Sequence, residues 1–199
     1  MDKTEKILKI ARNKGFLRPR DLDDYGIART YISRLVEKNL LKKVGRGLYI
    51  FADTEPTTNH TIAQVCKRIP NGVVCLLSAL QFHDLTTQQP YQVWIALDRK
   101  AWKPKVSDLP VNVVRFGQGP VYNEGVEHHN IEGVEVKIYN PTKTVADCFK
   151  YRNKIGLHIA LEALRECRLQ RKCSNDNLWY YAKICRVTNI MRPYMESMP

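Results

Sequence analysis

The sequence predicts an α+β protein in which short helices and a hairpin come first and a mixed domain of strands and helices follows. Apolar residues recur at helical spacing through the first 40 residues and again after Pro141. Four strand-like runs lie between these regions: YQVWIAL (91–97), VNVVRF (111–116), GVEHHNI (125–131) and VEVKIYN (134–140). At 199 residues the chain is long enough for one large domain or two small ones.

The first 40 residues predict three short helices with glycines between them. Thr4 can cap the first helix, and Gly15 can end it. Pro19 suits the first turn of the second helix, which Gly26 ends. The third helix is expected over residues 28–38.

A basic hairpin follows the third helix. Lys42 and Lys43 lie on its first strand, Arg46 lies at its tip between two glycines, and residues 48–51 return. Three short helices followed by a two-stranded hairpin describe a winged helix-turn-helix, in which the hairpin is the wing. We therefore predict a winged helix-turn-helix DNA-binding domain over residues 1–52.

The third helix has an apolar face and a polar face. At 100° per residue, Ile32, Leu35, Val36 and Asn39 share the side expected to face the core. The opposite side is polar, and the N-terminal part of this helix is the part that reads the major groove in helix-turn-helix proteins. Base contacts are therefore expected from Arg29, Thr30, Ser33 and Arg34. Phosphate or minor-groove contacts are expected from Tyr31, Lys38, Lys42, Lys43 and Arg46.

The charge balance favours a nucleic-acid partner. The chain holds 32 Lys and Arg against 20 Asp and Glu, a net charge of +12. Both ends are more basic than the middle, with 13 basic and 8 acidic residues in 1–55 and 9 and 4 in 151–199. A basic domain is the electrostatic footprint of a protein that binds double-stranded DNA.

The composition predicts neither a metal nor a cofactor. The six cysteines form no C-x-x-C pair and are expected to be reduced and buried. There is no glycine-rich phosphate loop, so no nucleotide site is expected. No apolar run reaches the length of a membrane span, and the N-terminus lacks the apolar core of a signal peptide, so a cytoplasmic location is expected.

The second domain is expected over residues 58–199, after a polar linker. Thr58 can cap a helix that runs to about Arg68, and an apolar helix is expected from Val73 to near His83. Glu132-Gly133 should form the turn between the last two strands. Asp147 follows a helix start and should support that helix electrostatically.

Two other functions are compatible with these residues. Glu135 and Lys137 have the E-x-K form of one class of Mg²⁺-dependent nucleases, which also needs an upstream aspartate, here Asp98 or Asp108. Alternating charges on a solvated strand explain the same residues, and we do not expect an enzyme. A winged helix can also serve only as a protein-interaction scaffold.

The chain resembles the AbiEi-type antitoxins, the transcriptional regulators of bacterial type IV toxin–antitoxin systems. In the N-terminal part the resemblance is carried by RPRDL, GIARTYISRLVEKNLL and GRGLYIF. In the second domain it is carried by LLSALQFHDLTTQQPYQVWIAL, YNPTKTVADCFKYRNKIG and MRPYMES. One departure is Asn39, where the family pattern usually has glycine, and this should move only the helix end.

The resemblance implies an α+β antitoxin domain after the winged helix. It also implies a repressor that binds inverted repeats at its own promoter and neutralises a nucleotidyltransferase-like toxin without forming a stable complex. The residues themselves support only the DNA-binding half of this expectation.

A basic stripe in the C-terminal region is a candidate antitoxin surface. On helical spacing, its four residues cover one broad side: Arg165, Arg168, Arg171 and Lys172. The stripe is either a solvated face or a surface for an anionic partner, which could be flanking DNA or nucleic acid also used by the toxin.

Overall fold

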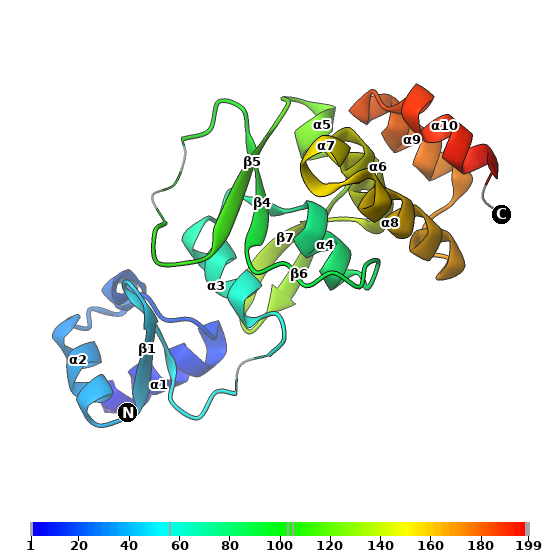
Figure 1. Cartoon of the computed structure of the whole chain (residues 1–199). Helices are drawn as coiled ribbons and strands as arrows, with labels where there is room; N and C mark the ends of the chain where they lie inside the picture. Colours follow the sequence, from blue (N-terminus) through cyan, green and yellow to red (C-terminus); the bar gives the residue numbers. More distant parts are fainter. Residues whose placement is uncertain (1, 56, 103, 105, 198–199) are drawn as a thin grey trace. The chain divides into compact units, whose positions relative to one another are not determined.

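Figure 1 shows the computed structural model of the chain, which describes residues 2–55, 57–102, 104 and 106–197. These residues fall into two compact units. The first comprises Met1–Arg68, Val106–Leu109 and Asn130–Val136, and the second comprises Ile69–Lys105, Pro110–His129 and Lys137–Pro199. The predicted domain boundary at residues 52–58 stays a prediction, because a compact unit is defined by packing and a domain by its capacity to fold alone.

The first unit begins with helix α1 (Lys3–Lys14). The predicted cap at Thr4 is wrong. Asp2 holds the N-cap position, and its backbone N–H donates to the Glu5 carboxylate at 3.3 Å. An acidic residue three positions after the cap can reach back in this way, so Thr4 lies inside the first turn. Gly15 ends the helix as predicted, with φ 64°.

Two further helical segments follow, as predicted. The first of them, η1 (Pro19–Tyr25), is a 3₁₀ helix that ends at Gly26 in the left-handed conformation. The second is helix α2 (Thr30–Glu37), whose Ile32 and Leu35 are each only 2% exposed. Asn39 was expected on the same buried face, and this is wrong. It is exposed at φ 55°, where the chain leaves the helix, a conformation that asparagine tolerates better than most residues.

The wing consists of strands β1 (Leu41–Gly45) and β2 (Leu48–Phe51), which pair antiparallel with Lys43 opposite Tyr49. Leu17 exchanges backbone hydrogen bonds of 2.8 and 3.0 Å with Tyr49, which fixes the returning strand. The core beneath contains Ile7, Leu22, Ile32, Leu35 and Leu41, drawn from the helices and the first strand. The predicted α+β class is confirmed, and its first elements have the order of a winged helix-turn-helix.

Helix α3 (His60–Arg68) also groups with the first unit and begins two residues after Thr58, the predicted cap. Carboxylates from distant segments fix both of its ends. Glu132 accepts hydrogen bonds from the Thr57 N–H at 2.8 Å and contacts His60 Nδ1 at 2.7 Å. Asp108 contacts Arg68 through two hydrogen bonds of 3.1 Å. The position of α3 is therefore set by long-range contacts.

A five-stranded mixed sheet has the order β5-β4-β3-β7-β6. Its strands are β3 (Val73–Val74), β4 (Val93–Asp98), β5 (Val111–Phe116), β6 (Val126–Ile131) and β7 (Val134–Tyr139). β4 and β5 are parallel, β3 is antiparallel to β4, and β3 is parallel to β7. Four of these strands match the predicted runs, and Glu132 and Gly133 form the predicted turn with φ 51° and 74°.

Strand β3 corrects the expected helix from Val73. Val73 pairs with Ala96, and Val74 pairs with Ile95 on one side and Ile138 on the other, so this two-residue strand lies in the middle of the sheet. Both valines are buried, and a strand buried on both faces has no polar alternation that a sequence pattern could reveal. The apolar helix α4 (Leu76–Phe82) begins only after the strand and ends next to His83, as expected.

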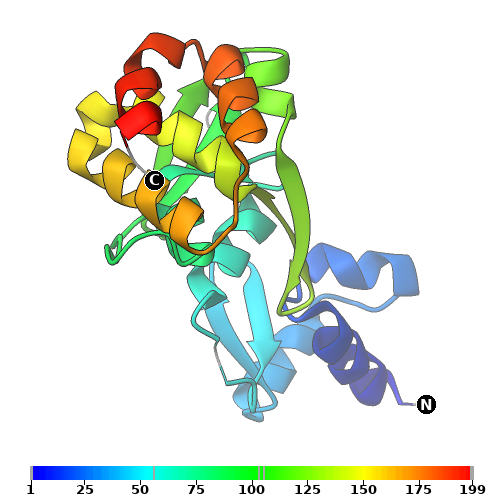
Figure 2. The same ribbon diagram turned by 90° about the vertical axis from the view of Figure 1, so that its right-hand side faces the viewer.

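Helices fill the C-terminal part of the second unit (Figures 1 and 2). A short unpredicted helix, α5 (Pro120–Asn123), precedes them. The C-terminal helices are α6 (Pro141–Lys150), α7 (Arg152–Ile155), α8 (Leu157–Leu169), α9 (Asn175–Cys185) and α10 (Thr188–Ser197). Five of the six cysteines are buried, as the composition predicted. Among the described residues, none of the helices is both long enough and apolar enough to cross a bilayer.

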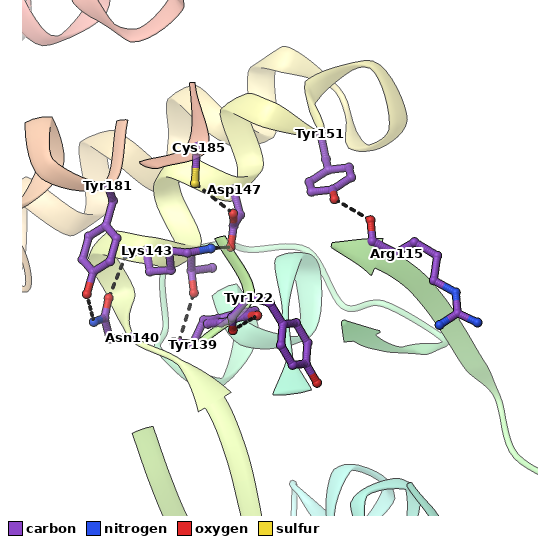
Figure 3. A network of polar contacts seen from close by, with 10 residues as sticks. Arg115, Tyr122, Tyr139, Asn140, Lys143, Asp147, Tyr151, Tyr181 and Cys185 are labelled. Atoms are coloured by element: carbon purple, nitrogen blue, oxygen red, sulfur yellow. Dashed lines mark hydrogen bonds and ion pairs between the residues drawn. The ribbon is translucent and has the colours of Figure 1, made fainter. Parts of the chain in front are cut away.

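A buried ion pair lies at the centre of the second unit (Figure 3). The side chains of Lys143 and Asp147, one turn apart on α6, are both 0% exposed, and Lys143 Nζ donates to Asp147 Oδ2 at 2.6 Å. Cys185 Sγ from α9 donates to the other carboxylate oxygen at 3.2 Å. Lys143 Nζ also lies 4.3 Å from the centre of the Tyr139 ring and makes a cation–π contact with it. Asp147 thus links α6 to α9, and because it lies past the first turn of α6, the predicted electrostatic support of the helix start is wrong.

Burial raises the pKa of Asp147 above its ordinary value, although the neighbouring Lys143 opposes this shift. We expect Lys143→Met or Asp147→Leu alone to lower the free energy of unfolding by about 3–5 kcal/mol, because each leaves an uncompensated buried group. The double variant should recover most of the loss, since its replacements are apolar. Urea unfolding followed by circular dichroism measures all three. Additive losses in the double variant would contradict the coupling.

Candidate nucleic-acid interface

The structure exposes the residues that the sequence assigns to DNA contact on helix α2. Thr30, Ser33, Arg34 and Lys38 are all exposed, while Tyr31 is half-buried. The Arg34 guanidinium lies 5.4 Å from the centre of the Tyr31 ring, which gives it a cation–π contact. This contact restricts the Arg34 side chain on the outer face of the helix without removing its charge.

Arg29 lies at the N-terminal end of α2 and is already engaged in an ion pair. Its Nε donates to Asp23 Oδ1 at 3.1 Å, and its Nη2 donates to the other oxygen of the same carboxylate. The hydrogen bond from Arg29 lowers the pKa of Asp23, and the same bond raises the pKa of Arg29. In the unbound protein Arg29 is therefore partly neutralised, unlike Arg34.

The wing presents its three predicted contact residues to solvent. Lys42, Lys43 and Arg46 are exposed. The backbone N–H of Arg46 donates to Asp108 Oδ2 at 3.2 Å, which holds the wing tip. This backbone bond is the largest of the contacts that lower the pKa of Asp108, and Arg68 lowers it further. Asp108 thus serves as an anchor for the hairpin.

A hollow of about 350 Å³ lies within the first unit, and we call it the arginine hollow. Its charged lining consists of five arginines: Arg18, Arg20, Arg29, Arg46 and Arg68. Pro19 and Gly47 complete the lining, which contains no carboxylate. Arg29 and Arg68 are each paired with a carboxylate outside the lining, but the charges of Arg20 and Arg68 still repel Arg18, which favours an anion in the space between them.

Arg18 is the most constrained member of the arginine hollow. Burial lowers the pKa of its guanidinium below the ordinary value, and the charge of Arg20 adds to the effect. Its Nη2 atom is buried and has no hydrogen-bond partner among the described residues. An unpaired buried donor costs about 1–3 kcal/mol.

Three of these arginines, Arg18, Arg20 and Arg68, were not among the predicted contact residues. The R-P-R spacing of Arg18 and Arg20 around a helix start was a local signal for two of them. Arg68 gave no such signal, because it lies 22 residues after Arg46 and reaches the wing only through the fold, where its Nη1 donates to the Arg46 carbonyl at 3.1 Å.

Of the residues considered for a nuclease, the structure places Lys137 and Asp98 in one hollow and leaves Glu135 and Asp108 out of it. Asp108 is held by the wing tip and by Arg68. Lys137 lines this hollow of about 410 Å³ in the second unit, together with Asp98 and His128. Glu135 is exposed and does not line that hollow. Within the part of the chain that the structure describes, no three His, Cys, Asp or Glu side chains lie close enough together to hold a metal ion.

The expected single basic stripe in the C-terminal region is wrong. Helix α8 ends at Leu169, and Arg171 has φ 53°, so Arg171 and Lys172 lie beyond the helix. The Lys172 N–H donates to the Cys167 carbonyl at 2.9 Å, a Schellman turn formed without glycine. No glycine in the sequence marked this end.

Two members of that set make internal contacts. Arg168 Nη2 donates to Asn175 Oδ1 at 2.8 Å and to the Met195 carbonyl at 3.0 Å. Lys172 Nζ donates to the His83 carbonyl. Arg165 and Arg171 are exposed and remain the candidates for an anionic partner.

Comparison with known proteins supports the N-terminal assignment. The model of a family described as "Transcriptional regulator, AbiEi antitoxin" matches residues 5–52. Over 90% of this chain and 71% of the other, the fold is similar to the crystal structure of the RV2827C protein from Mycobacterium tuberculosis, with a TM-score of 0.62 and 13% sequence identity. That likeness concerns the fold alone. No curated protein matches the sequence. The resemblance to AbiEi-type antitoxin regulators is thus confirmed for residues 5–52, the segment that holds α1, η1, α2 and the wing.

Proposed function

We propose that the chain is a cytoplasmic DNA-binding transcriptional repressor that autoregulates its own operon and neutralises a nucleotidyltransferase-like toxin. One observation carries the DNA-binding half. The exposed basic residues of α2 and the wing fall inside residues 5–52, the segment that matches a family of transcriptional regulators. Under this proposal the chain acts by binding and not by catalysis.

The dimensions of α2 suit major-groove recognition. An α-helix with its side chains is about 10–12 Å across, which fits a major groove about 12 Å wide, and the eight residues of α2 present about two turns to it. Arg34 on its outer face can form a bidentate contact with guanine, and the wing lysines can contact phosphates. An operator of inverted repeats would take one copy of the chain on each half-site.

The antitoxin half is proposed from the family description and from the resemblance of the second domain. The partner would be a cognate toxin that the protein opposes without a stable complex. A scaffold that binds only protein is the competing function. Binding to the DNA upstream of its own gene that weakens with salt would support the regulator, and the scaffold would show no such binding.

Arg34→Ala should weaken binding to the operator by about 1–3 kcal/mol and affect random DNA much less, because a bidentate base contact would be lost. Fluorescence anisotropy on both duplexes measures the difference. Lys9→Ala is the matched control, since Lys9 is exposed on α1 and carries the same charge. Equal losses on the two duplexes would mean that Arg34 contacts only the backbone.

Lys42→Ala combined with Lys43→Ala should weaken binding to every sequence. We expect the slope of log K against log salt to fall by about one unit for each lost phosphate contact. Titration at four or more salt concentrations gives the slope. An unchanged slope would remove the wing strand from the interface.

Arg165→Glu combined with Arg171→Glu should abolish neutralisation of the toxin and leave repression intact, because both residues are exposed in the second unit. Survival of cells that express the toxin and activity of a promoter reporter measure the two functions separately. Lys183→Glu with Arg192→Glu is the matched control, since both residues are exposed and make the same charge change. If neutralisation and repression both persist in the first variant, these two arginines are only solvated surface, and if repression alone is lost, they contact DNA.

A further inference from the structure

The arginine hollow lies where the elements proposed to contact DNA come together. Arg29 belongs to the start of α2 and Arg46 to the tip of the wing, and both line the same space. A DNA strand that passes between the recognition helix and the wing would run over this space. Its phosphates are the anions nearest to these guanidinium groups in such a complex.

The guanidinium of Arg68 is held in position before any ligand arrives. Asp108 accepts two hydrogen bonds of 3.1 Å from it, and the Arg46 carbonyl accepts a third of 3.1 Å. The same Asp108 carboxylate accepts from the Arg46 backbone N–H, so the wing tip and the end of α3 are fixed together. A site built in this way loses little side-chain freedom when it binds.

Arg18 supplies a donor without an acceptor. Its buried Nη2 atom has no partner among the described residues, whereas its backbone N–H donates to Asp21 at 2.7 Å. A guanidinium offers two parallel N–H groups that match two oxygens of a phosphate. An oxyanion in the hollow would offset the repulsion of Arg18 by the charges of Arg20 and Arg68.

We propose that the arginine hollow is a binding site for a phosphate of the DNA backbone, which extends the DNA interface from the winged helix to Arg68 on α3. This inference rests on the proposed function and adds residues to it. Arg68 lies outside residues 5–52, so the family match does not include it.

The test uses the full chain with Arg18→Gln, Arg20→Gln and Arg68→Gln, each made singly. Each variant should lower the slope of log K against log salt by about one unit on the operator and on random DNA alike. Lys9→Gln should leave the slope unchanged, because Lys9 does not line the hollow. Arg20 is exposed, so its variant is expected to fold even if the other two do not, and circular dichroism checks all of them.

The Asp108→Asn variant tests whether Arg68 contacts DNA directly or acts only by holding the wing in position. This variant keeps all five arginines but weakens the anchor of Arg68 and the wing tip. We expect it to retain the wild-type slope, with Arg68→Gln losing about one unit. If Asp108→Asn lowers the slope as much as Arg68→Gln does, Arg68 acts by holding the wing and the proposal is wrong for this residue.

Inorganic phosphate distinguishes DNA from a free ligand. We expect inorganic phosphate at up to about 10 mM to weaken DNA binding only as much as its ionic strength predicts. A melting temperature that rises with phosphate in the wild type but not in Arg18→Gln, with an unchanged salt slope, would assign the hollow to a free phosphate compound and overturn the proposal. If the wild type does not bind DNA at all, the proposed function fails; if it binds and all three variants keep its slope, only this inference fails.

Discussion

The buried contact between Lys143 and Asp147 is the constraint on which the packing of the second unit depends. Removing two charges from water is costly, and their mutual attraction offsets that cost only when the remaining polar atoms also find partners. Here Cys185 donates to the carboxylate, and the Tyr139 ring faces the ammonium group. Because these partners belong to α9 and β7, α6 can satisfy its charges only when both elements are in place. The pair thus selects one arrangement of the helices on the sheet.

The ring of Tyr139 connects this pair to the rest of the core. It stacks on Phe116 with centroids 5.5 Å apart. Its hydroxyl donates to the Tyr122 carbonyl at 2.7 Å (Figure 3). Phe116 in turn stacks on Tyr151, whose hydroxyl donates to the Arg115 carbonyl at 2.9 Å. The two tyrosine rings thus bury apolar area while their hydroxyl groups still find acceptors. One continuous set of contacts therefore joins β5, β7 and α6.

How much the sequence predicts depends on how local each signal is. The winged helix was predictable because Pro19, Gly26 and the glycines around Arg46 mark its turns directly. Asn39 shows the limit of a periodic pattern, since its angle fitted the buried face although the helix had already ended. The two-residue strand β3 had too few residues to show a period. Both wrong predictions concern either the end of a helix or a strand that forms only because neighbouring strands pair with it.

The arginine hollow could not be predicted as a whole for a related reason. Its members come from four separate segments, and Asp108, which fixes one of them, comes from a fifth. A sequence shows net charge but not which charges are committed to internal contacts. Arg168 and Lys172 donate hydrogen bonds to backbone carbonyls, so part of the positive charge of residues 151–199 is committed to internal contacts. In the first unit, Arg34, Lys42 and Lys43 stay exposed, and the carboxylates Glu132 and Asp108 are occupied at the ends of α3. The basic surface best placed to meet DNA is therefore that of the first unit.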